Sequence, residues 1–238
     1  MRKLHKMNIF KSVKNRGYEF IYKFFLLPKN IYFNFRVLPF EQARHLPFFV
    51  NYGVKIEEIH KGCLELNVDK ISKYMISFGR GGSEGIALME RGIFSVKPGA
   101  KVIFNGAAQF HAGSRLWIDE KGYVEFGRDF SANRNFTLFY NNKISFGNDC
   151  MIGWNVQIID GNAHMMLYNE IPKESKSVIK IGDHVWIGAE CKICRGVTIG
   201  DNSVVAYGST ITAGSFDSNV LIGGYPAKEI RKGVNWRK

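Results

Sequence analysis

The chain has 238 residues, of which 45% are hydrophobic, and a formal net charge of +12. This length and composition exclude a disordered protein and allow one domain with a substantial core, with or without an appendage. The apolar run from Phe20 to Leu27 is interrupted by Lys23 and stopped by Pro28, so it is too short to span a membrane. Because the first 23 residues also lack the apolar segment of a cleavable signal, we expect a cytoplasmic protein.

Residues 1–52 are predicted to form a basic, aromatic cap. Positions 1–40 contain nine Lys or Arg and one Glu, which gives +8 of the total charge, interleaved with many aromatic residues. The prolines Pro28, Pro39 and Pro47 indicate helical and irregular structure that covers the open end of the next domain. The charge has two open interpretations, a solvated face whose aromatics pack inward or a surface that lies peripherally against an anionic membrane. No nucleic-acid-binding motif accompanies it, so no nucleic-acid partner is expected.

Residues 53–225 are predicted to form a repeat domain with a period of six. Aliphatic residues mark every sixth position at Ile181, Ile187, Ile193, Ile199, Val205 and Ile211. Four residues after each stands a small or β-branched residue: Val185, Cys191, Val197, Ser203, Ser209 and Ser215. This pattern is neither helical nor a simple strand alternation. Three such hexads predict a triangular coil of 18 residues, and coils stacked at about 4.8 Å form three parallel sheets.

The same rhythm extends toward the N-terminus with interruptions. Coil starts at Phe104, Phe126, Phe146, Ile181 and Ile199 are separated by 22, 20, 35 and 18 residues. The 35-residue step predicts a long loop outside the prism at about residues 164–180, and a loop of that length in a tight solenoid is usually functional. Residues 64–68 and 93–96 are predicted as less regular strands that begin the prism.

The four cysteines are predicted to be structural. The pair Cys191-x-x-Cys194 would suit a metal or redox site, but no second pair stands at zinc spacing. The repeat already explains Cys150 and Cys191 as small residues that fill the core, as does the usual burial of cysteine. No metal site is therefore predicted.

The hexads between about Phe126 and Arg231 resemble those of the hexapeptide-repeat acyltransferases. The segments 126–135 (FGRDFSANRN), 181–188 (IGDHVWIG) and 224–228 (GYPAK) are similar to galactoside and maltose O-acetyltransferases. The segments 154–164 (WNVQIIDGNAH) and 34–47 are closer to capsular and exopolysaccharide O-acetyltransferases. The resemblance implies an all-β, left-handed parallel β-helix with an N-terminal cap, a long extruded loop at about 164–180 and a C-terminal tail over residues 226–238.

The resemblance further implies transfer of acetyl from acetyl-CoA to a hydroxyl of a capsular polysaccharide, an exopolysaccharide or its precursor. His164, at the start of the long loop, matches the general base, and an imidazole with a pKa near 6.5 suits that role without a covalent intermediate. Asn133 matches the acceptor-binding asparagine that the family contributes across a subunit interface. Trp154 and Asp160 are also assigned to the acceptor, although for Asp160 a place at a corner is the favoured interpretation.

The remaining matches concern CoA, which in the family lies between neighbouring prisms of a homotrimer. Trp186, Gly188 and Ala189 match the pantetheine region, and Thr212 matches a further contact. Lys228 and Arg231 match the basic end that meets the phosphates, where cations form charge-assisted hydrogen bonds. The sequence departs from the family at Tyr207, where a small residue is usual, and at Ala213, which replaces a lysine.

Three alternatives stay open at this point. An acyltransferase for a soluble amino sugar or small alcohol would show the same residues. A γ-type carbonic anhydrase shares the prism but needs three zinc-binding histidines, and the remaining histidines at 5, 45, 60, 111 and 184 show no ligand spacing to His164. A structural β-helix without activity is disfavoured because His164, Trp186 and Lys228 are all present.

Overall fold

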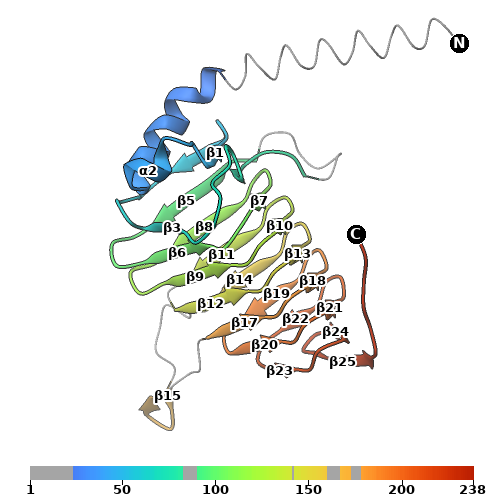
Figure 1. The fold of residues 1–238 in the computed structure, drawn as a ribbon. Coiled ribbons are helices and arrows are strands. Elements are labelled where there is room, and N and C mark those ends of the chain that lie inside the picture. The colour runs from blue at the N-terminus through green and yellow to red at the C-terminus, as the bar shows by residue number, and fades with distance from the viewer. Residues whose placement is uncertain (1–23, 83–89, 141, 160–166, 173–177) are drawn as a thin grey trace, which may run out of the picture.

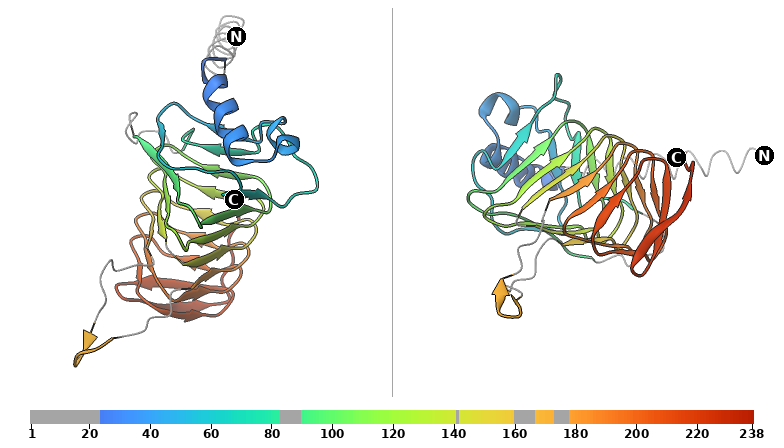
Figure 2. Two further views of the ribbon diagram at one scale, coloured as in Figure 1. Left: turned by 90° about the vertical axis from the view of Figure 1, so that its left-hand side faces the viewer. Right: turned by 90° about the horizontal axis from the view of Figure 1, so that it is seen from below.

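The chain winds around a triangular prism whose three faces are parallel β-sheets (Figures 1 and 2). The computed structural model describes residues 24–82, 90–140, 142–159, 167–172 and 178–238. Each coil passes through sheet A, then sheet B, then sheet C, and the next coil begins beside the last. The fold is the left-handed parallel β-helix that the sequence predicts.

The strands of each sheet are hydrogen-bonded in chain order. Sheet A contains β1 (Phe48–Val50), β4 (Ile76–Phe78), β7 (Ala108–Phe110), β10 (Phe130–Ala132), β13 (Met151–Ile152), β18 (Trp186–Ile187), β21 (Val204–Val205), β24 (Val220–Gly224) and β25 (Ala227–Lys232). Sheet B contains β2 (Val54–Ile56), β5 (Gly92–Val96), β8 (Arg115–Ile118), β11 (Thr137–Tyr140), β14 (Gln157–Ile159), β19 (Lys192–Cys194) and β22 (Thr210–Ile211). Sheet C contains β3 (Leu64–Leu66), β6 (Lys101–Phe104), β9 (Tyr123–Phe126), β12 (Lys143–Phe146), β17 (Ile179–Ile181), β20 (Val197–Ile199) and β23 (Gly214–Phe216).

The register in sheet C confirms the predicted coil starts. Phe104 pairs with Phe126, Phe126 with Phe146, Phe146 with Ile181 and Ile181 with Ile199. The excursion between β14 and β17 leaves the prism, and its described part is a small hairpin of β15 (Leu167–Tyr168) and β16 (Ile171–Pro172) that stands apart from the coils (Figure 1). The predicted extruded loop is therefore present.

The hexad pattern fails at its last predicted position. Ser215 is exposed, whereas the sequence places it inward. Ile199 pairs with Phe216, and Phe216 packs against the core in the inward place. The last step along sheet C is thus one residue shorter than 18, which turns Ser215 to the outside.

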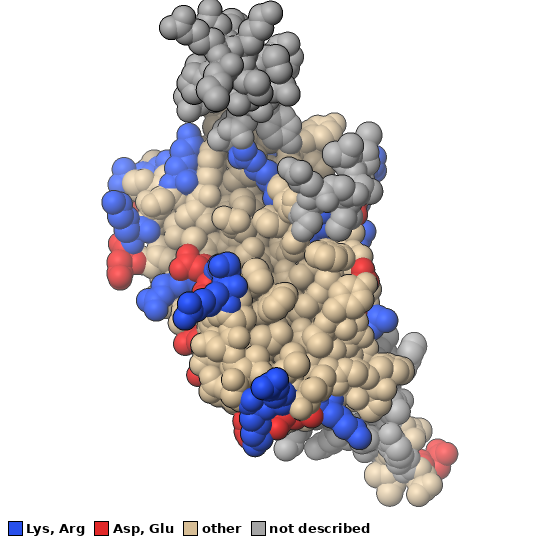
Figure 3. Space-filling view, turned by 90° about the vertical axis from the view of Figure 1, so that its right-hand side faces the viewer, with Lys and Arg blue, Asp and Glu red and all other residues tan. Residues whose placement is uncertain are grey.

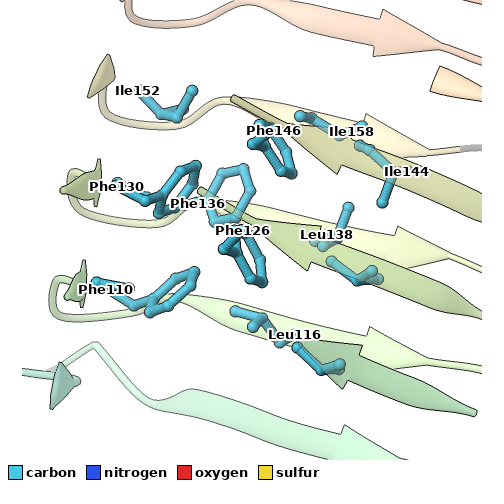
Figure 4. Close-up of a cluster of buried hydrophobic side chains, with 14 of the residues drawn as sticks. Phe110, Leu116, Phe126, Phe130, Phe136, Leu138, Ile144, Phe146, Ile152 and Ile158 are labelled. Atoms are coloured by element: carbon cyan, nitrogen blue, oxygen red, sulfur yellow. The ribbon is translucent and has the colours of Figure 1, made fainter. Parts of the chain in front are cut away.

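Two kinds of side chain fill the interior of the prism. Phe104, Phe126 and Phe146 stack in one column, with ring centroids 5.2 Å apart at each step. Figure 4 shows how Phe110, Phe130 and Phe136 crowd around this column. Below it, Ile181 and Ile199 continue the column, and burying each such side chain contributes about 1.5–3 kcal/mol.

The cap satisfies the free edge of β1 with two buried asparagines. Helical residues 24–37 place Asn30 and Asn34 one turn apart, facing that strand. The amide of Asn34 donates to the Phe48 carbonyl at 2.8 Å, and its oxygen accepts from the Phe48 N–H at 3.0 Å. Asn30 accepts from the Val50 N–H at 2.6 Å in the same way. The helix therefore replaces the missing strand without extending the sheet.

The remaining elements close the ends of the chain. Helix α2 (Phe40–Ala43) follows the cap helix, and β25 folds back antiparallel on β24 beyond the last coil. Over the described residues, no helix combines the length and the apolar character needed to cross a membrane.

Candidate active site

One edge of the prism collects most of the predicted site residues. This A/B edge consists of the segments that join each strand of sheet A to the next strand of sheet B. Backbone N–H groups of His111, Asn133, Gly153 and Gly188 donate to the coil below at 2.8–2.9 Å. The four residues therefore stand one above another in consecutive coils, about 4.8 Å apart at each step.

Tight stacking explains why glycine occupies two places in this column. A Cβ added to Gly153 would lie 2.4 Å from the Ala189 nitrogen, and one added to Gly188 would lie 2.8 Å from the Val205 oxygen. Contacts that close do not occur between real atoms, so these positions accept no side chain. The edge is consequently narrow below Asn133, where the resemblance locates the pantetheine arm.

Five predicted residues meet at the A/B edge. Asn133 and Gly188 belong to the column itself, and Trp154 and Ala189 follow it by one residue in their coils. Trp186 lies on the outer face of sheet A two residues before Gly188, and its side chain is 37% exposed. The structure thus places these acceptor-side and CoA-side residues along one line of the surface.

The other predicted residues lie elsewhere on the chain. Thr212 follows β22 at the B/C edge, the opposite end of the sheet B strands, where β14 leads into the excursion. Lys228 and Arg231 are exposed on β25, beyond the last coil. Asp160 and His164 fall outside the described residues. The predicted site is therefore divided between two edges of one prism.

His111 is a site residue that the sequence analysis did not select. It stands directly above Asn133 and forms a hydrogen bond with that side chain. Burial lowers the pKa of His111 below its usual value, the Asn133 hydrogen bond opposes this shift, and the charge of Arg134 adds to it. The Nδ1 atom is buried without a hydrogen-bond partner, so the bond to Asn133 involves Nε2. A neutral imidazole therefore orients Asn133, and its spacing of one coil was the available signal.

The C-terminal tail lies beside Trp186, which the sequence analysis also did not anticipate. Trp236 stacks on His184 with ring centroids 4.1 Å apart, and it lies 6.1 Å from the Trp186 ring. The Trp236 indole donates to the His184 carbonyl at 2.8 Å. The tail thereby borders the exposed face on which Trp186 lies.

Both nitrogens of His184 have acceptors. Nε2 lies 3.0 Å from the Trp236 carbonyl, and Nδ1 lies 2.7 Å from an oxygen of Asp149. The Trp236 carbonyl raises the pKa of His184, burial opposes this, and the Asp149 carboxylate raises it further. Burial would raise the pKa of Asp149, but hydrogen bonds from Lys238 and His184 hold it below its usual value. Protonated His184 thus fastens the tail to the prism.

The lower part of the A/B edge has features that suit CoA. Trp186 offers an exposed ring, Gly188 leaves the backbone open, and Lys228 and Arg231 form no salt bridge with any described carboxylate. Tyr207 follows the same edge one coil below Ala189 and is 69% exposed. Its ring stands where the family has a small residue, so it would contact the adenosine end directly.

Residues 179–213 match the family model described as bacterial transferase hexapeptide (six repeats). The chain is 33% identical over 130 residues to a galactoside O-acetyltransferase of Escherichia coli, covering 50% of this chain and 62% of the relative. It is 28% identical over 140 residues to the putative lipopolysaccharide biosynthesis O-acetyl transferase WbbJ of the same organism, covering 54% of this chain and 71% of that protein.

A solved galactoside acetyltransferase in complex with coenzyme A is 32% identical, with a TM-score of 0.47, over 55% of this chain and 64% of that one. The chain spans less than two thirds of the length of the galactoside O-acetyltransferase it matches. The family match and the register of the coils together place this chain in the hexapeptide-repeat transferase family.

Proposed function

We propose that this protein transfers acetyl from acetyl-CoA to a sugar hydroxyl of a surface polysaccharide or its precursor. The observation that carries the proposal is the A/B edge, which aligns Asn133 with Trp186, Gly188 and Ala189 in adjacent coils. Relatives named as galactoside and lipopolysaccharide O-acetyltransferases support the same chemistry. Acyl transfer to a soluble amino sugar or a small alcohol is the alternative that the product analysis below separates.

In the proposed reaction His164 takes the proton of the acceptor hydroxyl while its oxygen attacks the thioester carbonyl. The carbon–sulfur bond then breaks, and the protonated imidazole returns its proton to the departing sulfur. Asn133 would hold the acceptor by hydrogen bonding, with His111 fixing its orientation. Trp186 and Ala189 would line the pantetheine arm, while Lys228 and Arg231 would meet the phosphates.

The same proposal includes a homotrimer with shared sites. Asn133 and the origin of the excursion lie on different edges of one prism, so a second copy placed edge to edge would unite them. Figure 3 shows that the side carrying the sheet A strands has a mostly uncharged centre with Lys and Arg toward its rim. A surface of that kind suits contact between copies. Sedimentation equilibrium should give three times the 27.1 kDa chain mass.

The test of catalysis is release of the CoA thiol from acetyl-CoA with candidate glycans. His164→Ala should lower kcat by about 10²-fold or more, the scale expected for loss of a general base. His45→Ala is the matched control because His45 is exposed in the cap. Mass and NMR analysis of the product identifies an ester or an amide. Near-normal turnover of His164→Ala would overturn the assignment, and zinc in the purified protein would favour the carbonic anhydrase alternative.

We also propose that the cap contacts an anionic membrane surface. The outward side of helical residues 24–37 and of α2 is largely apolar, and it exposes Phe24, Phe25, Ile31, Tyr32, Phe35 and Phe40. The strongly basic sequence of the first 40 residues complements anionic lipid. Changing Phe25, Tyr32 and Phe35 to serine should abolish sedimentation with phosphatidylglycerol vesicles. Unchanged sedimentation, or equal binding to phosphatidylcholine vesicles, would refute the membrane contact.

A further inference from the structure

A second hollow lies on the outer face of sheet A, above the Asn133 level. It has a volume of about 490 Å³ and lies where β1, β4 and β7 run side by side. Its described lining consists of Phe49, Lys73, Tyr74, Ser77, Arg80, Gly81, Gln109 and His111. The hollow therefore begins at the histidine that contacts the predicted acceptor-binding residue.

The lining combines positive charge with aromatic surface. Lys73 lies 5.0 Å from the centroid of the Tyr74 ring, and the Arg80 guanidinium lies 5.9 Å from that of Phe49. Tyr74 packs edge-on against Phe49, with centroids 5.2 Å apart. No acidic residue is among the described lining residues. Arginine and lysine held over aromatic rings provide a site for an anionic group beside flat apolar surface.

His111 joins this hollow to the A/B edge. Its side chain lines the hollow and also hydrogen-bonds Asn133. The turn through Gly81 and Gly82 follows the same border, since a Cβ on Gly82 would lie 3.1 Å from the Asn133 oxygen. A chain of sugars with one hydroxyl at Asn133 would therefore extend into the hollow.

The molecule is polarised along this line. The residues matched to CoA lie in the coils below Asn133 and on β25, whereas the hollow lies above Asn133. A ligand in the hollow thus lies on the acceptor side and not along the pantetheine arm. Ser77 and Gln109 add neutral hydrogen-bonding groups to its floor, as sugar hydroxyls require.

We propose that this hollow is a subsite for an anionic group of the acceptor glycan, a sugar carboxylate or a phosphate, held by Lys73 and Arg80. The inference rests on the proposed O-acetyltransferase function and narrows its substrate to negatively charged glycans. Lys73 and Arg80 would pair with the anion, and the rings of Phe49 and Tyr74 would pack against the sugar face. Specificity would arise because a neutral glycan leaves both cations without that partner.

The test measures binding without catalysis. His164→Ala protein, without acetyl-CoA, is titrated by calorimetry with oligomers of galacturonic acid, glucuronic acid and sialic acid. Each is compared with its carboxyl-reduced form, and galactose 1-phosphate tests the phosphate source. At least one acid should bind about tenfold more tightly than its reduced form, the value of one charge-assisted hydrogen bond. Lys73→Gln/Arg80→Gln should remove that difference.

The matched control is Lys70→Gln/Arg115→Gln, which removes two exposed cations outside the hollow. In turnover assays of otherwise unchanged protein, the Lys73/Arg80 variant should raise KM for the acidic acceptor and leave kcat and the KM for acetyl-CoA unchanged. Equal binding of acidic and reduced glycans, no binding of any acid, or a rise only in the KM for acetyl-CoA would overturn the subsite. Charge-dependent binding without acetyl transfer by unmutated protein would instead overturn the proposed function alone.

Discussion

The coils above the excursion differ from the coils below it. From β6 to β12 the column in the core is aromatic, coil steps are 22 and 20 residues, and β6, β8, β9, β11 and β12 each have four residues. From β17 to β22 the column is aliphatic, the step is 18 residues, and β18, β21 and β22 each have two. Longer sides enclose a wider triangle, and phenylalanine fills it.

This difference separates two tasks. Narrow coils of constant period present a regular edge, as an extended arm such as pantetheine requires. Wider coils of variable length allow turns such as that at Gly81 and Gly82, which shape the hollow beside His111. The excursion leaves the prism at the border between the two regions, after β14. The proposed base would thus act where acceptor and co-substrate meet.

The largest effect is expected from emptying the aromatic column. Phe126→Ala should lower the free energy of unfolding by about 4 kcal/mol, because the ring is fully buried between Phe104 and Phe146. Ile199→Ala should cost about 3 kcal/mol in the narrow region. Urea unfolding measures both, with exposed Phe139→Ala as control. A larger loss for Ile199→Ala would break the comparison.

A smaller loss is expected at the cap of the wide end. Asn34→Ala would leave the buried N–H and carbonyl of Phe48 without partners, which should cost about 3 kcal/mol in unfolding free energy. Asn67→Ala is the control, because that asparagine makes its hydrogen bond to Asn105 in an exposed position. An equal, small effect of both variants in the same urea series would show that the helix does not seal the edge.

The smallest effect concerns the tail on the narrow end and depends on pH. The pKa of His184 is raised in the folded chain, so its stabilisation is complete below the ordinary value of 6.5 and is lost as pH rises through the raised value. His184→Asn tolerates the positive φ of 53° at this position. The variant should melt about 1 °C below the unmutated chain near pH 5.5 and closer to it near pH 8.5. A gap that widens with pH would contradict the clasp, and His60→Asn is the control.

The sequence predicts the narrow region far better than the wide one. Between Ile181 and Ile211 each inward position carries an aliphatic residue at constant spacing, so hydrophobic periodicity alone defines the coils. In the wide region the corners vary in length, and only the Phe104, Phe126 and Phe146 column retains the rhythm. The side-chain amides of Asn30 and Asn34 give no periodic signal, because their partners lie 20 and 14 residues away.

The candidate site was predictable where a motif marked it. Asn133, Trp186 and Gly188 lie in recognisable segments, and the fold aligns them. His111 was not predictable because its role comes from standing one coil above Asn133, a relation that depends on the 22-residue step. Trp236 was missed because a tail that returns to His184 is a contact over 52 residues, with no local sequence pattern.

The two asparagines of the cap helix also bear on how many molecules this solenoid can join. A ladder of parallel strands with a bare first rung is a growing tip onto which another copy could add, end over end, until a fibril forms. Asn30 and Asn34 occupy that rung with groups that offer nothing onward, and β25 turns back across the last rung of sheet A. Self-association is thereby directed sideways, toward a closed ring of finite size.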